Sequence, residues 1–179
     1  MRYLIAITLP QGLSANYSKI QKRYKSKNWN IALPPHITLI PPAKLTSSFK
    51  ALSEALKKRA KDFKRFKIDI VGIDQFANTG NTIFAQVAKS DDLLNLQRLV
   101  IKSIEGHLEI MKGYPRQYHP HITLSNDLTA DEAQEKFPGI EKLVSDQQFI
   151  VDRISLFRNG DSDSQYQKIA DFVFRCATK

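Results

Sequence analysis

The sequence has little cysteine: Cys176 is the only one in 179 residues. A single cysteine cannot form an internal disulfide, and no histidine lies within five residues of it, so neither a disulfide framework nor a local Cys–His metal site is indicated. Long hydrophobic runs are lacking too, because no stretch reaches the roughly 18 uninterrupted apolar residues of a membrane-spanning helix. The opening, MRYLIAITLP, is apolar for only a few residues and has no small-residue cleavage site. We therefore expect a cytoplasmic protein with no membrane partner.

Negative charge is also in short supply. The chain has 27 Lys and Arg against 18 Asp and Glu, a formal net charge of +9. This excess favours polyanionic partners such as nucleic acid, although basic residues spread over helical faces, as in 57–67, can equally serve only to solvate the surface. With 42% hydrophobic and 25% charged residues the composition is that of an ordinary globular protein. The length predicts a single bilobal domain spanning 1–179.

Histidine is rare, with four in the chain, yet two of them occupy copies of the same segment. The sequence PPHITL at 34–39 is echoed by HPHITL at 119–124, and the repeated histidines are His36 and His121. No Gly-x-x-x-x-Gly-Lys-Ser/Thr phosphate loop occurs. The duplicated Pro-His-Ile-Thr-Leu is therefore the strongest functional signal in the sequence.

Side chains on a strand alternate between its two faces, so His36 and Thr38 should lie side by side, about 7 Å apart at Cα. Ile37 and Leu39 should then point into the core. The second copy repeats the pattern, with His121 and Thr123 on one face. If the two copies are related by a twofold axis, the two pairs face each other across a cleft.

The elements around the two copies are similar, and each group holds a long helix, a PHITL strand and a β-hairpin. This duplication predicts an α+β fold with two pseudo-symmetric lobes, antiparallel sheets lining a central cleft, and helices on the outside. The first group is expected to consist of strand 2–9, helix 12–25, a PHITL strand closed by Pro41-Pro42, helix 47–64, and strands 66–76 and 82–88. The second group is expected to begin with a helix capped by Ser90, followed by the second PHITL strand. A helix with a Thr129–Glu132 capping box, stopped by Pro138-Gly139, and strands 148–158 and 166–175 complete it.

Two imidazoles and two hydroxyls without a carboxylate cluster have a definite chemical use. Histidine has an ordinary pKa near 6.5, so one imidazole can be neutral while another is protonated. Displacement at phosphorus needs a base for the attacking oxygen and an acid for the leaving oxygen. The threonine hydroxyls would hold the non-bridging phosphate oxygens.

The two His-x-Thr-x segments, at 36–39 and 121–124, resemble those of the two-histidine (HXTX) phosphoesterase superfamily, which includes bacterial 2'-5' RNA ligases and RNA 2',3'-cyclic phosphodiesterases. The resemblance covers nearly the whole chain and is strongest to the compact bacterial phosphoesterase subgroup. It implies a hydrolase that needs no cofactor or metal and acts on RNA ends or nucleotides with a cyclic phosphate or a 2'-5' linkage. No obligate protein partner is indicated.

The resemblance also implies roles for the site residues. For hydrolysis, His36 is the proton donor and His121 the proton acceptor, and Thr38 and Thr123 complete the catalytic set. The local sequence does not distinguish the two histidines, and ligation would exchange their roles. His119 is not part of this resemblance, because many family members have another residue type there. Strand alternation alone places it on the same face as His121, and we expect it to contact the substrate at the rim of the cleft.

Two other functions stay open at this stage. His119 and His121 form a His-x-His pair that could bind a metal ion with a third ligand, making the protein a metal-dependent hydrolase. The chain could also be a basic RNA- or nucleotide-binding module without catalytic activity, since a fold does not establish activity. Several aromatic residues could stack on a base, but aromatic strand residues are usually core, so the sequence selects none of Tyr3, Phe84, Tyr114, Tyr118 and Phe157.

Overall fold

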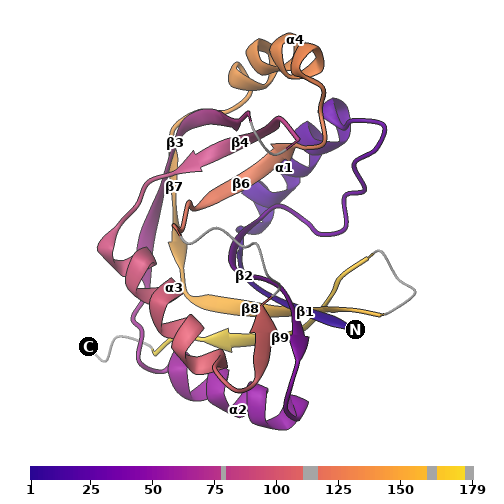
Figure 1. The fold of residues 1–179 in the computed structure, drawn as a ribbon. Coiled ribbons are helices and arrows are strands. Elements are labelled where there is room, and N and C mark those ends of the chain that lie inside the picture. Colours follow the sequence, from indigo (N-terminus) through magenta and orange to yellow (C-terminus); the bar gives the residue numbers. More distant parts are fainter. Residues whose placement is uncertain (78–79, 111–116, 161–164, 176–179) are drawn as a thin grey trace.

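The computed structural model describes residues 1–77, 80–110, 117–160 and 165–175, so Cys176 and Tyr114 lie outside the described part. The α+β class expected from the sequence is confirmed (Figure 1). The helices are α1 (Gln11–Tyr24), α2 (Phe49–Ala60), α3 (Asp91–Ile104) and α4 (Ala130–Glu141). The strands are β1 (Arg2–Thr8), β2 (His36–Leu45), β3 (Phe66–Phe76), β4 (Thr82–Val87), β5 (Leu108–Ile110), β6 (His121–Ser125), β7 (Gln147–Val151), β8 (Arg153–Asn159) and β9 (Gln167–Val173).

The strands form two antiparallel sheets, each of which contains one PHITL strand. Sheet A has the order β5-β2-β1-β8-β9, and sheet B has the order β6-β4-β3-β7. The first PHITL strand, β2, is next to β1 in sheet A, and the second, β6, is the edge strand of sheet B next to β4. The two sheets therefore place the repeated segment in comparable positions.

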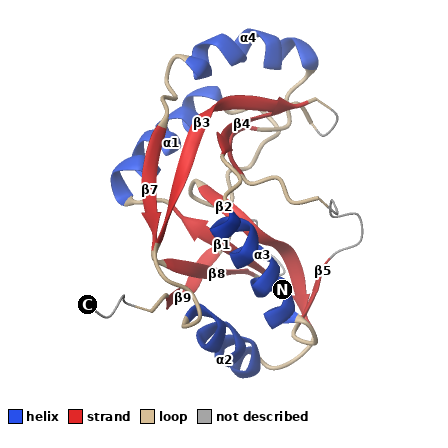
Figure 2. Ribbon diagram, turned by 90° about the vertical axis from the view of Figure 1, so that its left-hand side faces the viewer, coloured by secondary structure: helices blue, strands red, loops and turns tan. Residues whose placement is uncertain are grey.

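The two groups of elements seen in the sequence are not the two halves of the structure. The hairpin of the first group, β3–β4, belongs to sheet B, whereas β8–β9 of the second group belongs to sheet A. The helices also cross over: α1, which follows β1 of sheet A, packs on β6 of sheet B, and α3, which follows β4 of sheet B, packs on β2 of sheet A. In both views α1 and α4 lie at the sheet B end, and α2 and α3 lie at the sheet A end (Figures 1 and 2).

The expectation of one strand over 148–158 is wrong. The chain leaves sheet B after Val151, the last residue of β7, and enters sheet A at Arg153, the first residue of β8. Asp152 lies between the two strands, and its carbonyl accepts a hydrogen bond from Phe174 N at 2.7 Å. A change in burial accompanies the crossing, since Phe149 and Val151 alternate with exposed residues whereas β8 is buried continuously from 154 to 157.

Two predicted proline stops are also wrong. Strand β2 continues through Pro41 and Pro42 to Leu45. The two prolines lie between the paired positions Ile5–Ile40 and Tyr3–Ala43. The register shifts there, so that one residue of β1 faces two residues of β2. A bulge is one of the places where a strand tolerates a missing N–H.

Helix α4 likewise contains Pro138 and ends at Glu141. The side chain of Ile140, beyond the proline, is fully buried. Its packing offsets the backbone hydrogen bond that Pro138 cannot donate.

Both predicted helix caps are confirmed. Ser90 Oγ accepts from Leu93 N at 3.3 Å at the start of α3, and Thr129 and Glu132 form the reciprocal capping box of α4. Within the described ranges, no helix is both long and apolar enough to cross a bilayer.

One hydrophobic core joins the two sheets. It contains the inward residues of both PHITL copies, Ile37, Leu39, Ile122 and Leu124, all fully buried as the alternation predicted. Since these residues point into the core, the histidines and threonines between them lie on the opposite face of each strand.

Candidate active site

The two PHITL strands lie close to each other although they belong to different sheets. Strand β6 has β4 on one side only, and β2 pairs with β5 only at positions 43–45, beyond the PHITL segment. Strands β2 and β6 are in contact. The strands that begin with His36 and His121 are therefore brought together from the two sheets.

Each repeated histidine makes the same hydrogen bond. His36 Nδ1 lies 2.8 Å from the carbonyl oxygen of Pro34, and His121 Nδ1 lies 2.8 Å from that of His119. A carbonyl oxygen can only accept, so Nδ1 must carry the proton in both rings. The neutral form of each imidazole therefore has Nε2 as its proton-accepting atom.

Burial lowers the pKa of both histidines. For His36, desolvation lowers the pKa, the bond to Pro34 raises it in part, and charge on His121 lowers it further. For His121, desolvation again lowers the pKa, and the hydrogen bond to the His119 carbonyl raises it in part. Charge on the His119 side chain lowers the pKa of His121 further. Both repeated histidines are neutral near pH 7 in the unliganded protein.

A second matched pair of hydrogen bonds ties the strands together through the threonine carbonyls. Gln21 of α1 donates from Nε2 to Thr123 O at 2.8 Å, and Tyr118, just before β6, donates from its hydroxyl to Thr38 O at 3.1 Å. Each donor belongs to a segment next in sequence to one PHITL strand and bonds to the other PHITL strand. These cross-ties fix the backbone of both threonines.

A pocket of about 170 Å³ opens beside these strands and contains His36 and Thr123. Its full lining is Gln21, Trp29, Asn30, Ile31, Ala32, Leu33, His36, Thr123 and Asn126. The structure thus brings one residue of each predicted His/Thr pair into a common pocket. The convergence of all four side chains on one phosphate stays a prediction.

Two phenylalanines form the apolar surroundings of His121 and His119. The ring centroid of Phe76 lies 5.1 Å from that of His121 and 5.0 Å from that of His119, both edge to face. Phe84 lies 5.2 Å from the His121 ring. The two imidazole centroids are 6.5 Å apart. This packing removes water from His121, which is the cause of its lowered pKa.

The sequence model of the 2'-5' RNA ligase superfamily matches residues 10–163. The chain belongs to this superfamily. Its match spans most of the chain and includes both PHITL segments, so the resemblance noted from the sequence is confirmed.

Relatives within the superfamily carry phosphoesterase in their names. One, from Oceanobacillus iheyensis, is 30% identical over 171 residues, covering 92% of this chain and 93% of its own. Another, from Staphylococcus haemolyticus, is 26% identical over 154 residues, covering 85% of this chain and 86% of its own. Membership and names together support phosphoesterase activity.

Solved structures of other bacterial proteins share the fold. TT0787 of Thermus thermophilus has a TM-score of 0.68 at 17% identity and covers 99% of this chain and 100% of its own. E. coli LigT has a TM-score of 0.63 at 15% identity and covers 97% of this chain and 96% of its own. LigT has also been solved in complex with 3'-AMP.

Of the aromatic residues considered as stacking platforms, Tyr3 and Phe157 belong to the buried hydrophobic clusters, whereas Phe84 packs against His119 and His121. Tyr3, Phe84 and Phe157 are buried, and Tyr118 is engaged with Thr38. The sequence reasoning missed Trp29, because its place in the pocket depends on how the loop before β2 folds back.

Gln21 and Phe76 were also missed. Gln21 had a readable signal, since it stands four residues after Tyr17 on the apolar stripe of α1 and is 4% exposed. A polar residue on an apolar stripe indicates a buried hydrogen bond. Phe76 ends the long strand β3 and carried no local signal for a contact with the histidines.

The metal-binding alternative requires a third ligand beside His119 and His121, and the described residues do not supply one. Across the part of the chain that the structure describes, no three His, Cys, Asp or Glu side chains are grouped as metal ligands. His121 Nδ1 is bonded to the carbonyl of His119, so only its Nε2 could reach an ion.

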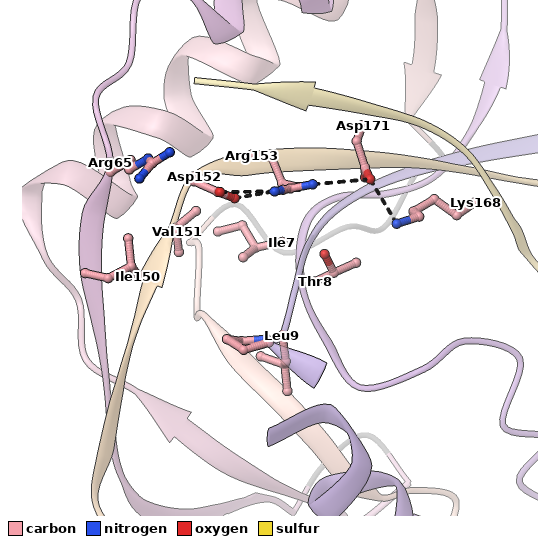
Figure 3. A pocket seen from close by; sticks show the side chains of 11 residues that line it. Ile7, Thr8, Leu9, Arg65, Ile150, Val151, Asp152, Arg153, Lys168 and Asp171 are labelled. Atoms are coloured by element: carbon pink, nitrogen blue, oxygen red, sulfur yellow. Dashed lines mark hydrogen bonds and ion pairs between the residues drawn. The ribbon is translucent and has the colours of Figure 1, made fainter. Parts of the chain in front are cut away.

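A larger cavity, of about 490 Å³, lies where the chain crosses between the sheets, and none of the predicted catalytic residues lines it (Figure 3). Arg153 lies between two carboxylates there, bonding Asp152 at 2.8 Å and lying 3.9 Å from Asp171. Lys168 bonds Asp171 from the other side at 2.9 Å. The charges in this cavity are thus largely paired with each other.

Proposed function

We propose that the chain is a metal-independent phosphoesterase that hydrolyses, or reversibly forms, 2',3'-cyclic phosphate or 2'-5' phosphodiester linkages in RNA or nucleotides. The observation that carries the proposal is the matched pair of histidines, each with Nδ1 held by a carbonyl 2.8 Å away and Nε2 as the atom for proton transfer. Superfamily membership supports the same chemistry. The 3'-AMP complex of E. coli LigT supports a nucleotide as the ligand.

In the proposed hydrolysis, Nε2 of neutral His121 takes a proton from water as the water oxygen attacks phosphorus. The bond from phosphorus to one ribose oxygen breaks, and protonated His36 donates its Nε2 proton to that oxygen. The hydroxyls of Thr38 and Thr123 donate to the non-bridging oxygens as their negative charge increases. The assignment of His36 as acid follows the family resemblance and is reversed for ligation.

The resting protein needs one additional proton for this reaction, because burial lowers the pKa of both histidines. A phosphodiester is an anion, and an anion beside an imidazole favours its protonated form. Substrate binding therefore raises the pKa of the histidine that serves as acid. The remaining histidine, repelled by that positive charge, stays neutral as the base.

His119 is proposed as a substrate-binding residue. His119 lies just before β6, outside the strand, with its ring centroid 6.5 Å from that of His121. The ring packs edge to face against Phe76 and Phe84, with centroid distances of 5.0 and 5.5 Å. These contacts hold the ring at the edge of the histidine cluster. In the proposed complex it contacts a phosphate oxygen and has no part in the proton transfers.

The proposal is tested by assaying 2',3'-cyclic nucleotides, cyclic-phosphate oligoribonucleotides and 2'-5' dinucleotides in the presence of EDTA, with products identified by the position of the phosphate. We expect turnover of at least one substrate class to persist after exhaustive chelation. Loss of activity that zinc or manganese restores would support the His119–His121 metal site instead. Binding that is unchanged by His36→Ala, with no product from any substrate, would support a non-catalytic module.

A further inference from the structure

The pocket beside His36 has a wall suited to a flat ring. Trp29, with the aliphatic side chains of Ile31 and Leu33, lines the pocket that also holds His36 and Thr123. Its volume of about 170 Å³ is below the roughly 300 Å³ at which pockets begin to enclose a drug-sized ligand. The space fits one ring system of a ligand whose remainder lies in the open.

The segment that carries Trp29 is held in place at both ends. Trp29 N donates to the hydroxyl of the buried Ser26 at 3.0 Å, and Tyr166 N donates to the carbonyl of Ala32 at 3.0 Å. Leu33 packs against the small apolar cluster of Leu4, Ala6 and Phe157 on sheet A. Trp29 itself is only partly buried. The wall is therefore formed before a ligand arrives, which reduces the entropy lost on binding.

Amide groups accompany the aromatic wall. Asn30 and Asn126 line the same pocket, and Asn126 follows directly after β6. The hydroxyl of Thr82 donates to Asn126 Oδ1, which orients that amide. Amide side chains can both donate to and accept from the edge of a nucleobase. A wall of one indole with neighbouring amides is chemically suited to a base, since the indole offers an aromatic face and the amides offer both donors and acceptors.

Building on the proposed function, we propose that Trp29 is the stacking platform for the base of the nucleotide whose phosphate reacts. The phosphate of such a substrate is placed at His36 and Thr123, and both line the pocket with Trp29. A base joined to that phosphate through one ribose thus reaches the indole. Stacking is tolerant of base identity, because every base has a π-face, so the site accepts all four nucleotides with moderate preferences.

The test is a binding experiment that needs no turnover. Trp29 is the only tryptophan in the chain, so its fluorescence reports on this pocket alone. We expect 3'-AMP to quench the fluorescence of the wild-type protein and inorganic phosphate to leave it nearly unchanged. By calorimetry, Trp29→Leu should weaken 3'-AMP binding about tenfold, Trp29→Phe should weaken it much less, and neither should change phosphate binding.

A matched control is Phe49→Leu, which removes an exposed aromatic ring from α2, outside the pocket, and should leave 3'-AMP binding unchanged. Circular dichroism and thermal melting establish that each variant is folded. Wild-type 3'-AMP affinity in a folded Trp29→Leu protein would overturn the proposal. Equal loss of 3'-AMP and phosphate binding would overturn it too, since Trp29 would then only hold the loop.

Failure of this proposal is distinct from failure of the proposed function. If 3'-AMP binding depends on Trp29 but no cyclic phosphate or 2'-5' linkage is cleaved, the base pocket stands and the phosphoesterase activity falls. If cyclic nucleotides are cleaved with the same KM by wild type and Trp29→Leu, the activity stands and the base pocket falls. A wild-type protein that binds neither 3'-AMP nor a cyclic nucleotide contradicts both.

Discussion

His36 and His121 have matching surroundings but opposite tasks in the proposed reaction. In both, Nδ1 donates to a carbonyl two residues earlier in the chain, and in both burial lowers the pKa. They differ in the neighbouring charge that lowers the pKa further. For His36 this neighbour is His121, and for His121 it is His119. The matching geometry explains how one pair of residues can run hydrolysis and ligation, since the direction decides which ring starts protonated.

The lowered pKa values predict an acidic optimum. The acid of the free enzyme is lost as pH rises through a pKa below the ordinary 6.5, and the base is lost as pH falls through the other. We expect a bell-shaped profile of kcat/KM with its maximum below about pH 6.5, and a maximum of kcat at higher pH, because bound phosphate stabilises the imidazolium. Initial rates measured across about pH 5 to 8 give both profiles. A maximum of kcat/KM above pH 7 would contradict the assignment.

The threonine hydroxyls are expected to contribute less than the histidines. Thr38→Val and Thr123→Val each remove one donor to a phosphate oxygen and keep a β-branched side chain suited to the strand. We predict a fall in kcat of about 10²-fold for each, with KM changed little. Thr46→Val, an exposed position just beyond β2, serves as the control and should behave as wild type. Unchanged kcat in both variants would remove the threonines from the site.

At the scale of elements, the site depends on how firmly β2 and β6 are held side by side. Gln21→Leu and Tyr118→Phe each remove one cross-tie to a threonine carbonyl. We expect each to lower the free energy of unfolding by about 1 kcal/mol, and somewhat more for Gln21, whose side chain is buried. We also expect kcat to fall several-fold in both variants, because displaced reactive groups slow the chemical step. KM should stay unchanged in Tyr118→Phe, whereas Gln21→Leu can also alter KM because Gln21 lines the pocket. Urea unfolding and steady-state kinetics on the same samples measure both effects. A loss of stability at unchanged kcat would make the ties purely structural.

Much of this element pattern was readable from the sequence, because it depends on local signals. The predicted strand 66–76 coincides with β3, and the Ser90 and Thr129 caps lie where hydroxyls precede apolar periodicity. The PHITL strands followed from alternation alone. These signals involve residues a few positions apart, so they do not depend on the tertiary fold.

The failures concern features that only tertiary contacts decide. Residues 148–158 carry apolar residues on both sides of Asp152 and Arg153, and no Gly or Pro there indicates that the chain changes sheets at Asp152. The three-residue β5 is too short to have a period. Pro41 and Pro42 are accommodated by a register shift against β1, which the sequence of β2 does not encode by itself. The place of Trp29 beside His36 depends in the same way on contacts from β1, β8 and residue 166.

At the scale of the whole molecule, the crossing from β7 to β8 joins the two sheets next to a charged cluster (Figure 3). Asp171 accepts from the fully buried Ser155 at 2.6 Å and from Lys168 at 2.9 Å. Burial alone would raise the pKa of Asp171, but these two donors, with the charges of Lys168 and Arg153, lower it below its ordinary value of 3.8. The carboxylate therefore stabilises the fold above that pH and ceases to do so as pH falls through its lower folded-state pKa.

Replacing this carboxylate should have a small, pH-dependent effect. We predict that Asp171→Asn lowers the free energy of unfolding at pH 7 by about 0.5–1 kcal/mol, since solvent screens a partly exposed group. The difference from wild type should shrink as pH falls below 3.8. Asp146→Asn, at an exposed position between α4 and β7, is the control. Urea unfolding at neutral and acidic pH measures this difference in the free energy of unfolding. A difference between wild type and Asp171→Asn that increases as the pH falls would contradict the account.

The intertwined topology means that neither sheet alone contains all four proposed catalytic residues. Sheet A supplies His36 and Thr38, sheet B supplies His121 and Thr123, and each sheet is covered by a helix that follows a strand of the other. The central claim is that the two halves act as one catalytic unit, with one proton donor and one acceptor.

That claim is tested most directly by kcat on the best cyclic-phosphate substrate, in EDTA, for wild type, His36→Ala, His121→Ala and the double variant. Each single change should lower kcat by about 10² to 10⁴-fold with a folded protein and a similar KM. The double variant should be scarcely slower than the poorer single one, because groups that act as a unit are not additive. Near wild-type turnover by His121→Ala, or activity that EDTA removes and zinc restores, would contradict the two-histidine mechanism.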